Sequence, residues 1–385
     1  MKRSDEAVQH LVRVAPGALI VGKPLPWTVY DAGGNVLLKQ GFVIHSDMQL
    51  EQLFQRGLFY PRQEELEPDQ LPDSPPEDAP PRNPFHDYRG LLKSLETTLS
   101  SLSRGDEDAR LRLLGLARLI DRICEQSPDA CLALVHLYAV ETTATEQILF
   151  YSILCHFMGR GLGMDERRRL VLLAAALSAN LALHPILDKL NASSHPLTGP
   201  QRTIIHRHPV LGTQALKNAG VNNRLLLTIV EQHHENPDGT GYPQGLAGTA
   251  ILPEAQILGL AECYTALITR RGYRDRSDVG HARRVIRDSI GATPRPVIPQ
   301  AMLKALTSWP PGSLVRLANN EVAVVTHRPG RSSGHILQAI MDPRGSPYKH
   351  SFRRDGDLLE FNIKALEVPE QMPSMDYSRL WGFES

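Results

Sequence analysis

The sequence has no surplus of charge of either sign, because Lys+Arg and Asp+Glu number 42 each and the formal net charge is zero. Binding to a nucleic acid polymer or an anionic membrane therefore lacks its usual basic footprint. Cysteine is also scarce, with four residues and no CxxC spacing. This scarcity argues against a disulfide framework and favours a reducing compartment.

Long hydrophobic runs are missing as well. The N-terminal stretch MKRSDEAVQHLVRV has no continuous apolar segment of the kind found in signal peptides. The most apolar stretch, residues 170–187, is interrupted by Ser178, Asn180 and a His-Pro pair. We therefore predict a buried helix there and no membrane span, and we expect a cytoplasmic protein.

What the chain does contain is enough apolar sequence for more than one globular unit, with 42% hydrophobic and 22% charged residues over 385 positions. Helical periodicity dominates the middle, β-rich runs flank it, and a proline-dense acidic stretch separates the first two parts. The predicted fold is mainly α: a helical bundle between small β-rich N- and C-terminal modules. The expected units are a β-rich module at 1–60, a linker at 61–85, the helical domain at 86–307 and an antiparallel β module at 308–385.

Two local signals support the flanking modules. Ser46, with Gln49 three residues later, is typical of the start of a helix. Asn319 and Asn320 lie between two β-rich runs and predict a hairpin with a type I′ turn.

The stretch HHENPDGTGYPQGLAG, residues 233–248, carries the most specific motif. Adjacent histidines often mark a metal site, whereas Asp-Gly and Gly-Tyr-Pro are also ordinary turn sequences. Gly239 and Gly241 allow a ligand or partner close to the backbone, and Tyr242 offers an aromatic face with a polar tip.

This stretch, followed by AQILGLAECYTALITRRGYRDR, resembles the signature of HD-GYP domains, a branch of the HD metal-dependent phosphohydrolase superfamily. The resemblance covers roughly residues 110–330 and implies hydrolysis of cyclic di-GMP by two or three iron or manganese ions. It implies metal ligation for the residues that match the family's ligands, which are His208, His233, His234 and, in place of an aspartate, Glu262.

Several expected catalytic positions depart from the family pattern. Ser178 stands for a ligand histidine, Ala179 for the bridging aspartate, Ala182 for a lysine, and Gln147 for an earlier histidine. Two cations need a shared anion, and alanine provides none. We therefore expect no catalytic residues and no cofactor, with the surviving histidines making ordinary hydrogen bonds. The alternative is that they hold at most one Fe, Mn or Zn ion.

The loop and a basic turn are the remaining candidates. The predicted ligand or partner loop comprises Asp238, Gly239, Gly241, Tyr242 and Pro243, together with Arg271 and Arg274. In the family this loop is associated with docking to diguanylate cyclase (GGDEF) domains, which needs no metal. A guanidinium pair suits phosphate or guanine, but a solvated basic turn is equally consistent with the sequence.

The sequence thus predicts a pseudoenzyme: an interaction protein of the cyclic di-GMP network with a degenerate, non-catalytic domain. One alternative is a residual metal-dependent phosphodiesterase. Another is a receptor that binds cyclic di-GMP without cleaving it.

Overall fold

The computed structural model describes residues 82–139, 142–270, 277–330, 334–367 and 375–383, together with residues 11–13, 19, 21–25, 28–31, 33, 35–55 and 59–61. Most of the predicted linker, residues 62–81, lies outside the described residues. The same holds for Arg271 and Arg274. The described part is mainly helical, with a small antiparallel sheet in each flanking region, as predicted.

The N-terminal module combines a four-stranded sheet with one helix. The strands are β1 (Leu11–Arg13), β2 (Val29–Tyr30), β3 (Val36–Leu38) and β4 (Phe59–Pro61), in the order β1-β4-β2-β3. Helix α1 (Asp47–Gln55) begins after Ser46, whose hydroxyl accepts a hydrogen bond from the Gln49 backbone N–H at 3.2 Å, as a helix cap does.

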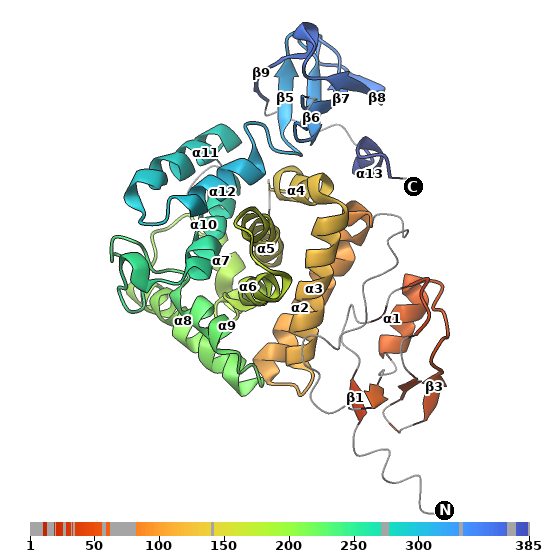
Figure 1. Ribbon diagram of the computed structural model, residues 1–385, viewed down its shortest axis with the longest axis vertical. Helices are drawn as coiled ribbons and strands as arrows, with labels where there is room; N and C mark the ends of the chain where they lie inside the picture. Colours follow the sequence, from red (N-terminus) through yellow and green to blue (C-terminus); the bar gives the residue numbers. More distant parts are fainter. Residues whose placement is uncertain are drawn as a thin grey trace, which may run out of the picture.

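The helical region forms the body of the molecule (Figure 1). Its helices are α2 (Pro84–Arg104), α3 (Ala109–Gln126), α4 (Pro128–Leu137), α5 (Ala144–Gly161), α6 (Glu166–Ser178), α7 (His184–Ala192), α8 (Gly199–Asn218), α9 (Arg224–Gln232), α10 (Pro253–Ile268), α11 (Val279–Asp288) and α12 (Val297–Leu306). The first of them begins inside the stretch that the sequence assigns to the linker.

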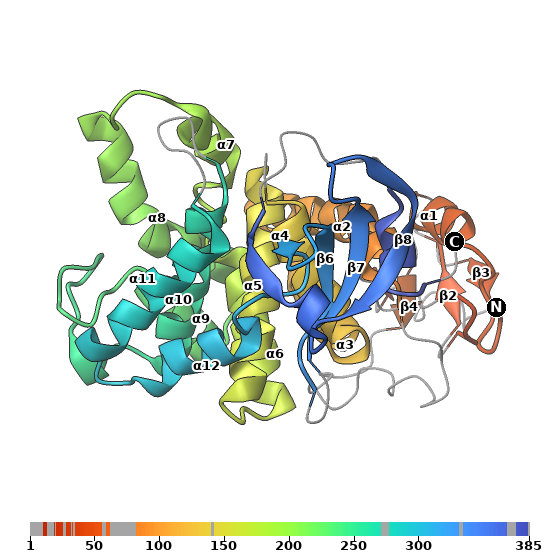
Figure 2. The ribbon, with the colours of Figure 1, turned by 90° about the horizontal axis from the view of Figure 1, so that it is seen from above.

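Helix α5 is the centre of this body, with other helices around it in Figure 1. It is apolar on nearly every side, so burial on all faces is the arrangement that hides the most apolar surface. The apolar run at 170–187 is buried over residues 172–181, whereas Pro185 near its end is exposed. It is also not the single helix that the sequence predicted, because α6 ends at Ser178 and a turn leads to α7. Figure 2 shows that α7 and α8 project at one end of the body.

The C-terminal module is a five-stranded antiparallel sheet in the order β8-β7-β6-β5-β9. Its strands are β5 (Leu314–Leu317), β6 (Val322–His327), β7 (Ile336–Met341), β8 (Pro347–Asp355) and β9 (Ile363–Leu366). The sequence did not indicate β8, because most of its side chains are polar and exposed and show no strict alternation.

The hairpin between β5 and β6 corrects one prediction. A type I′ turn needs positive φ at both central residues, but of the asparagine pair only Asn320 has one, at 69°. The Asn320 N–H donates to the Leu317 carbonyl at 3.0 Å, and the Leu317 N–H donates to the Glu321 carbonyl at 2.9 Å. The chain therefore needs one left-handed residue here, and asparagine tolerates that conformation.

Two contacts join the sheet to the helices. Gly312 has a φ of 87°, and an added Cβ would lie 2.7 Å from the Ala133 carbonyl oxygen, so only glycine allows α4 this close. The short helix α13 (Tyr377–Leu380) brings back Trp381, whose indole N–H donates to the Thr326 carbonyl at 2.7 Å.

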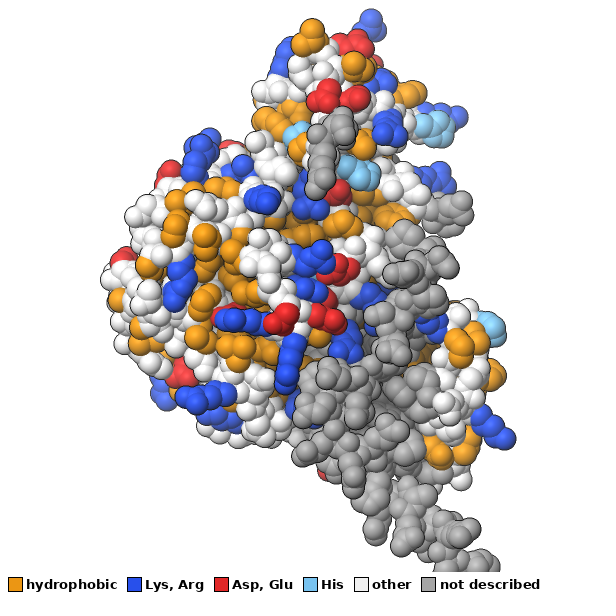
Figure 3. Space-filling view, in the orientation of Figure 1, with side chains coloured by type: hydrophobic (Ala, Val, Ile, Leu, Met, Phe, Trp, Pro, Cys, Tyr) orange, Lys and Arg blue, Asp and Glu red, His pale blue; other side chains and the backbone are white. Residues whose placement is uncertain are grey.

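The surface of the face in Figure 3 shows basic and acidic side chains interspersed, in keeping with the zero net charge. Among the described helices, none combines the length and the apolar character that a membrane crossing requires.

Candidate functional site

Three histidines meet where the end of one helix lies against the middle of another. His208 lies in α8, while His233 and His234 follow the last residue of α9. Helix α10 closes the group from the other side, and it approaches closely because residue 259 is glycine. An added Cβ there would lie 2.4 Å from the His233 carbonyl oxygen. These constraints hold the three rings in one place.

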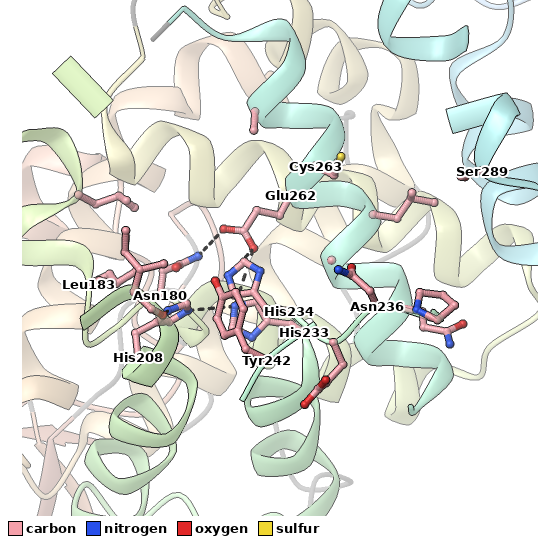
Figure 4. A pocket seen from close by; sticks show the side chains of 18 of the residues that line it. Asn180, Leu183, His208, His233, His234, Asn236, Tyr242, Glu262, Cys263 and Ser289 are labelled. Carbon is pink, nitrogen blue, oxygen red and sulfur yellow. Dashed lines mark hydrogen bonds and ion pairs between the residues drawn. The ribbon is translucent and has the colours of Figure 1, made fainter. Parts of the chain in front are cut away.

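The ligand atoms of the three rings all lie within 4.8 Å of one another. The His208 and His233 Nε2 atoms are 3.3 Å apart. Glu262 reaches from α10 toward the same point, and its Oε2 lies 3.8 Å from the Nε2 atoms of both His233 and His234 (Figure 4). The structure therefore brings together the four residues that the sequence singled out.

Hydrogen bonds fix which nitrogen of two of these rings carries the proton. The Nδ1 atoms of His208 and His233 each lie 2.6 Å from a backbone carbonyl, those of Ile205 and Val230. A carbonyl only accepts, so both Nδ1 atoms must be donors. In the neutral rings both Nε2 atoms then carry lone pairs, and these two lone pairs face each other.

Burial keeps all three rings neutral. Together with the charge of a neighbouring imidazole, which is a smaller cause, it lowers the pKa of His208, His233 and His234 to about 3 each. The Oε2 atom of Glu262 is buried and receives no hydrogen bond from any residue that the structure describes. Three acceptor atoms, the Nε2 atoms of His208 and His233 and the Oε2 atom of Glu262, thus converge beside the His234 ring.

Such a set fits a single metal cation. Imidazole nitrogens and a carboxylate oxygen are ligands that zinc, iron and manganese accept in proteins. His208, His233, His234 and Glu262 would hold the ion, and a cation would relieve the mutual repulsion of their lone pairs. The sequence-derived expectation of at most one ion stays a prediction.

The replaced family positions lie apart from this set or lack a ligand atom. The Ser178 hydroxyl is fully buried and donates to the Ala174 carbonyl at 2.7 Å, within its own helix. Ala179 is fully buried, and neither it nor Ala182 has a polar side-chain atom. Gln147 is buried on α5, where its amide donates to the Thr142 hydroxyl at 3.1 Å.

Two residues at the site were not predicted. Asn180 directly follows Ala179, and its side-chain amide donates to Glu262 Oε1 at 2.8 Å. His206 stacks on Tyr242, with ring centroids 4.5 Å apart and planes 8° from parallel. Asn180 could have been predicted from the sequence, because it adjoins the replaced aspartate position. No sequence feature indicated that the His206 ring would face Tyr242.

The glycine-rich loop folds back over the histidines. Glu235 anchors it by accepting hydrogen bonds from the backbone N–H groups of Gln244 and Leu246, at 2.7 and 2.8 Å. Gly239 has a φ of 80°, and an added Cβ on Gly241 would lie 2.3 Å from the Asn236 nitrogen, so both positions require glycine.

Tyr242 is half-buried and does not project freely from this loop. It is preceded by Gly241 and followed by Pro243, and its ring packs on His206 on one side and on His234, 4.8 Å away, on the other. Asp238 binds within the loop, where its carboxylate accepts from the Thr240 hydroxyl at 2.6 Å. The tyrosine therefore covers a candidate metal ligand.

A cavity of 1140 Å³ adjoins the cluster. It exceeds the roughly 300–1,000 Å³ typical of small-molecule sites. Helices α7, α8 and α10 and the segment before α12 contribute to its wall. The described lining residues include no Lys or Arg, but they include the carboxylates of Glu235, Asp238 and Glu262.

Comparisons with known proteins identify similar domains. Residues 121–291 match the family model "HD domain". A cyclic di-GMP phosphodiesterase of Borreliella burgdorferi is 27% identical over 45% of this chain and 46% of its own length. One from Pseudomonas aeruginosa is 29% identical over 56% of this chain and 52% of its own, and a cyclic di-GMP phosphodiesterase response regulator of Xanthomonas campestris is 33% identical over 30% of each.

The chain thus spans about half or less of the length of these relatives. Among solved structures, an HDG"Y"P protein from Bdellovibrio bacteriovorus aligns with 77% of this chain and 99% of its own, at 19% identity and a TM-score of 0.38. The matched segment contains the three histidines, Glu262 and the tyrosine loop. Residues 121–291 are therefore similar to HD domains, and the sequence-derived resemblance to HD-GYP proteins is confirmed at the level of similarity.

Proposed function

We propose that this protein binds a cyclic dinucleotide, with cyclic di-GMP as the first candidate, and does not hydrolyse it. The observation that carries this proposal is the convergence of ligand atoms from His208, His233, His234 and Glu262 beside a 1140 Å³ cavity. Ser178 and Ala179 add no ligand to it. A second cation would have no bridging carboxylate, so two-metal activation of a hydroxide has no basis in these side chains.

The ligand class is supported by the relatives and by the charge of the cavity. Relatives are named as phosphodiesterases of cyclic di-GMP or of 3′3′-cGAMP, both cyclic dinucleotides. A ligand with two phosphates needs positive charge, which no described lining residue supplies. The cation at the histidine cluster would provide that charge, and Arg271 and Arg274 are further candidates. Binding should therefore depend on a divalent ion.

A second function, docking of a diguanylate cyclase (GGDEF) domain, is supported by the outer side of the loop. Thr240, Gln244 and Ala247 are exposed there, while Glu235 fixes the backbone beneath them. A rigid exposed loop loses little entropy when it binds. The two functions are compatible, because the loop's inner side faces the histidines and its outer side faces solvent.

Calorimetry with the full-length chain tests the main proposal. Cyclic di-GMP should bind in the presence of Mn²⁺, binding should vanish with EDTA, and chromatography should recover the dinucleotide intact. Hydrolysis that His208→Ala abolishes, or two tightly bound ions per chain, would show that the protein is a phosphodiesterase. Failure of cyclic di-GMP to bind under either condition would refute the receptor function.

A further inference from the structure

We infer that Asn180 is a positioning residue that holds the Glu262 carboxylate for one cation only. This inference rests on the cation site proposed above. Neither Ser178 nor Ala179 provides a metal ligand, so the orientation of the Glu262 carboxylate matters more for the site.

The contact itself has one chemically allowed orientation. The Asn180 side-chain nitrogen lies 2.8 Å from Glu262 Oε1 and 3.2 Å from the Tyr151 hydroxyl oxygen. A carboxylate only accepts hydrogen bonds, so the amide must turn its NH₂ group, and not its oxygen, toward Glu262. The two N–H bonds of that group then serve two acceptors, one each.

Asn180 has little freedom to move away from this position. The residue is 2% exposed. Its backbone carbonyl accepts hydrogen bonds from the backbone N–H groups of Leu183 and His184 at 2.9 and 2.8 Å. These bonds fix the backbone in the turn between α6 and α7. Tyr151 is equally buried on the central helix α5, so the second partner of the amide is also immobile.

The Asn180 amide makes the two oxygens of the Glu262 carboxylate different from each other. Oε1 is occupied by Asn180, whereas Oε2 receives no hydrogen bond from the described residues and lies near the Nε2 atoms of His233 and His234 (Figure 4). A carboxylate held in this way offers one oxygen to one ion. Partners that orient a ligand commonly change metal affinity by about 10–100-fold when they are removed.

Zinc binding to the full chain tests this role without any measurement of activity. Zn²⁺ alone is titrated against the metal-free wild type, Asn180→Leu, Glu262→Gln and the double variant, and Co²⁺ absorption spectra report the ligand set. Asn191→Leu is the matched control, because Asn191 is a buried amide in the same cavity wall and makes no bond to Glu262. Thermal melts identify any variant that fails to fold.

We expect one Zn²⁺ per wild-type chain, about 10–100-fold weaker binding in Asn180→Leu with an altered Co²⁺ spectrum, and near-normal binding in Asn191→Leu. The double variant should bind no more weakly than Glu262→Gln, since Asn180 acts through Glu262. Unchanged affinity in Asn180→Leu, strictly additive losses, or a wild type that binds no zinc would overturn the inference. Hydrolysis of cyclic di-GMP, by contrast, would refute the proposed function, whereas the zinc affinities alone decide the role of Asn180.

Discussion

Two clusters in the described structure offer similar ligand atoms but differ in the hydrogen bonds that these atoms receive. Asp121, Glu125 and His156 form one, and His208, His233 and His234 form the other. In the first, Asp121 already receives hydrogen bonds from His156 and from both ends of the Arg169 guanidinium, at 2.6–2.9 Å. In the second, the Nε2 atoms of His208 and His233 face each other with lone pairs, and the described residues provide no donor to Glu262 Oε2. A set of metal-binding residue types therefore indicates a metal site only where no cationic side chain of the chain already fills it.

The pKa of Asp121 illustrates the difference. Burial alone would raise it, but hydrogen bonds from His156 and Arg169 hold the pKa below its ordinary value. The carboxylate is thus kept charged by partners from its own chain. Glu262 Oε2 lacks any such partner within the described structure.

Removing the internal cation of the first cluster should have the largest effect. Arg169→Met leaves the buried Asp121 charge without its main partner, so we expect the free energy of unfolding to fall by about 3–5 kcal/mol. Urea denaturation measures this. Arg160→Met is the matched control: it loses only an exposed pair with Glu125 and should cost about 1 kcal/mol or less. Equal effects of the two substitutions would contradict our description of the cluster.

Zinc should distinguish the two clusters in the wild type. At a free concentration 100-fold above the Kd, Zn²⁺ should stabilise the chain by about 2.7 kcal/mol. His233→Ala should abolish this gain, whereas His156→Ala should lower the starting stability and keep the gain. Chemical denaturation with and without Zn²⁺ provides the measurement. If His156→Ala lost the zinc response instead, zinc would bind at the cluster of Asp121, Glu125 and His156, which would contradict our assignment.

His136 provides a third case, a buried histidine with both nitrogens partnered. Its Nδ1 lies 2.9 Å from the Leu132 and Pro311 carbonyls, and its Nε2 lies 3.1 Å from the Tyr264 hydroxyl. Burial lowers its pKa to about 4 from an ordinary value of 6.5. Below pH 6.5 the unfolded chain therefore takes up a proton that the folded chain refuses until pH 4, and stability falls as the pH falls through this window.

Replacing His136 should flatten that dependence. Between pH 7 and pH 4.5, His136→Gln should lose about 2 kcal/mol less stability than the wild type, even if it starts lower. Denaturation curves at both pH values give the difference. Parallel losses in both proteins would mean that His136 is accessible to protons in the folded state.

The smallest effect concerns the tyrosine that covers His234. Tyr242→Ala removes two ring contacts and should cost about 1 kcal/mol of stability, whereas Tyr242→Phe keeps the stack and should resemble the wild type. His206→Ala removes one side of the same stack and should fall between them. Thermal melts rank the three variants.

The same alanine variant also addresses partner binding. If Tyr242 anchors a GGDEF domain, Tyr242→Ala should weaken its pull-down by much more than the phenylalanine variant does. If both variants retain the partner, docking does not use this ring.

The sequence predicted the elements best where one physical signal acted alone. Apolar periodicity indicated the helices α3, α5, α6 and α8, and Ser46 with Gln49 marked the start of α1. It failed at β8, where polar side chains on an edge strand removed the alternation. It also assigned a type I′ turn to Asn319 and Asn320, because two asparagines suit that turn locally, although strand pairing required a left-handed residue only at Asn320.

For the site, the sequence by itself determined which residue types are present: three histidines and a glutamate at the family's ligand positions, and Ser178 and Ala179 where no ligand atom is left. Only the tertiary structure decided how these residues are arranged. The direction of each side chain and the hydrogen bonds to its polar atoms depend on contacts between helices far apart in the chain. The 3.3 Å approach of two Nε2 lone pairs, the amide of Asn180 on one carboxylate oxygen, and the packing of Tyr242 over His234 all arise from the way α6, α8, α9 and α10 converge. Local sequence specifies a side chain's chemistry, but its partner atoms are supplied by packing.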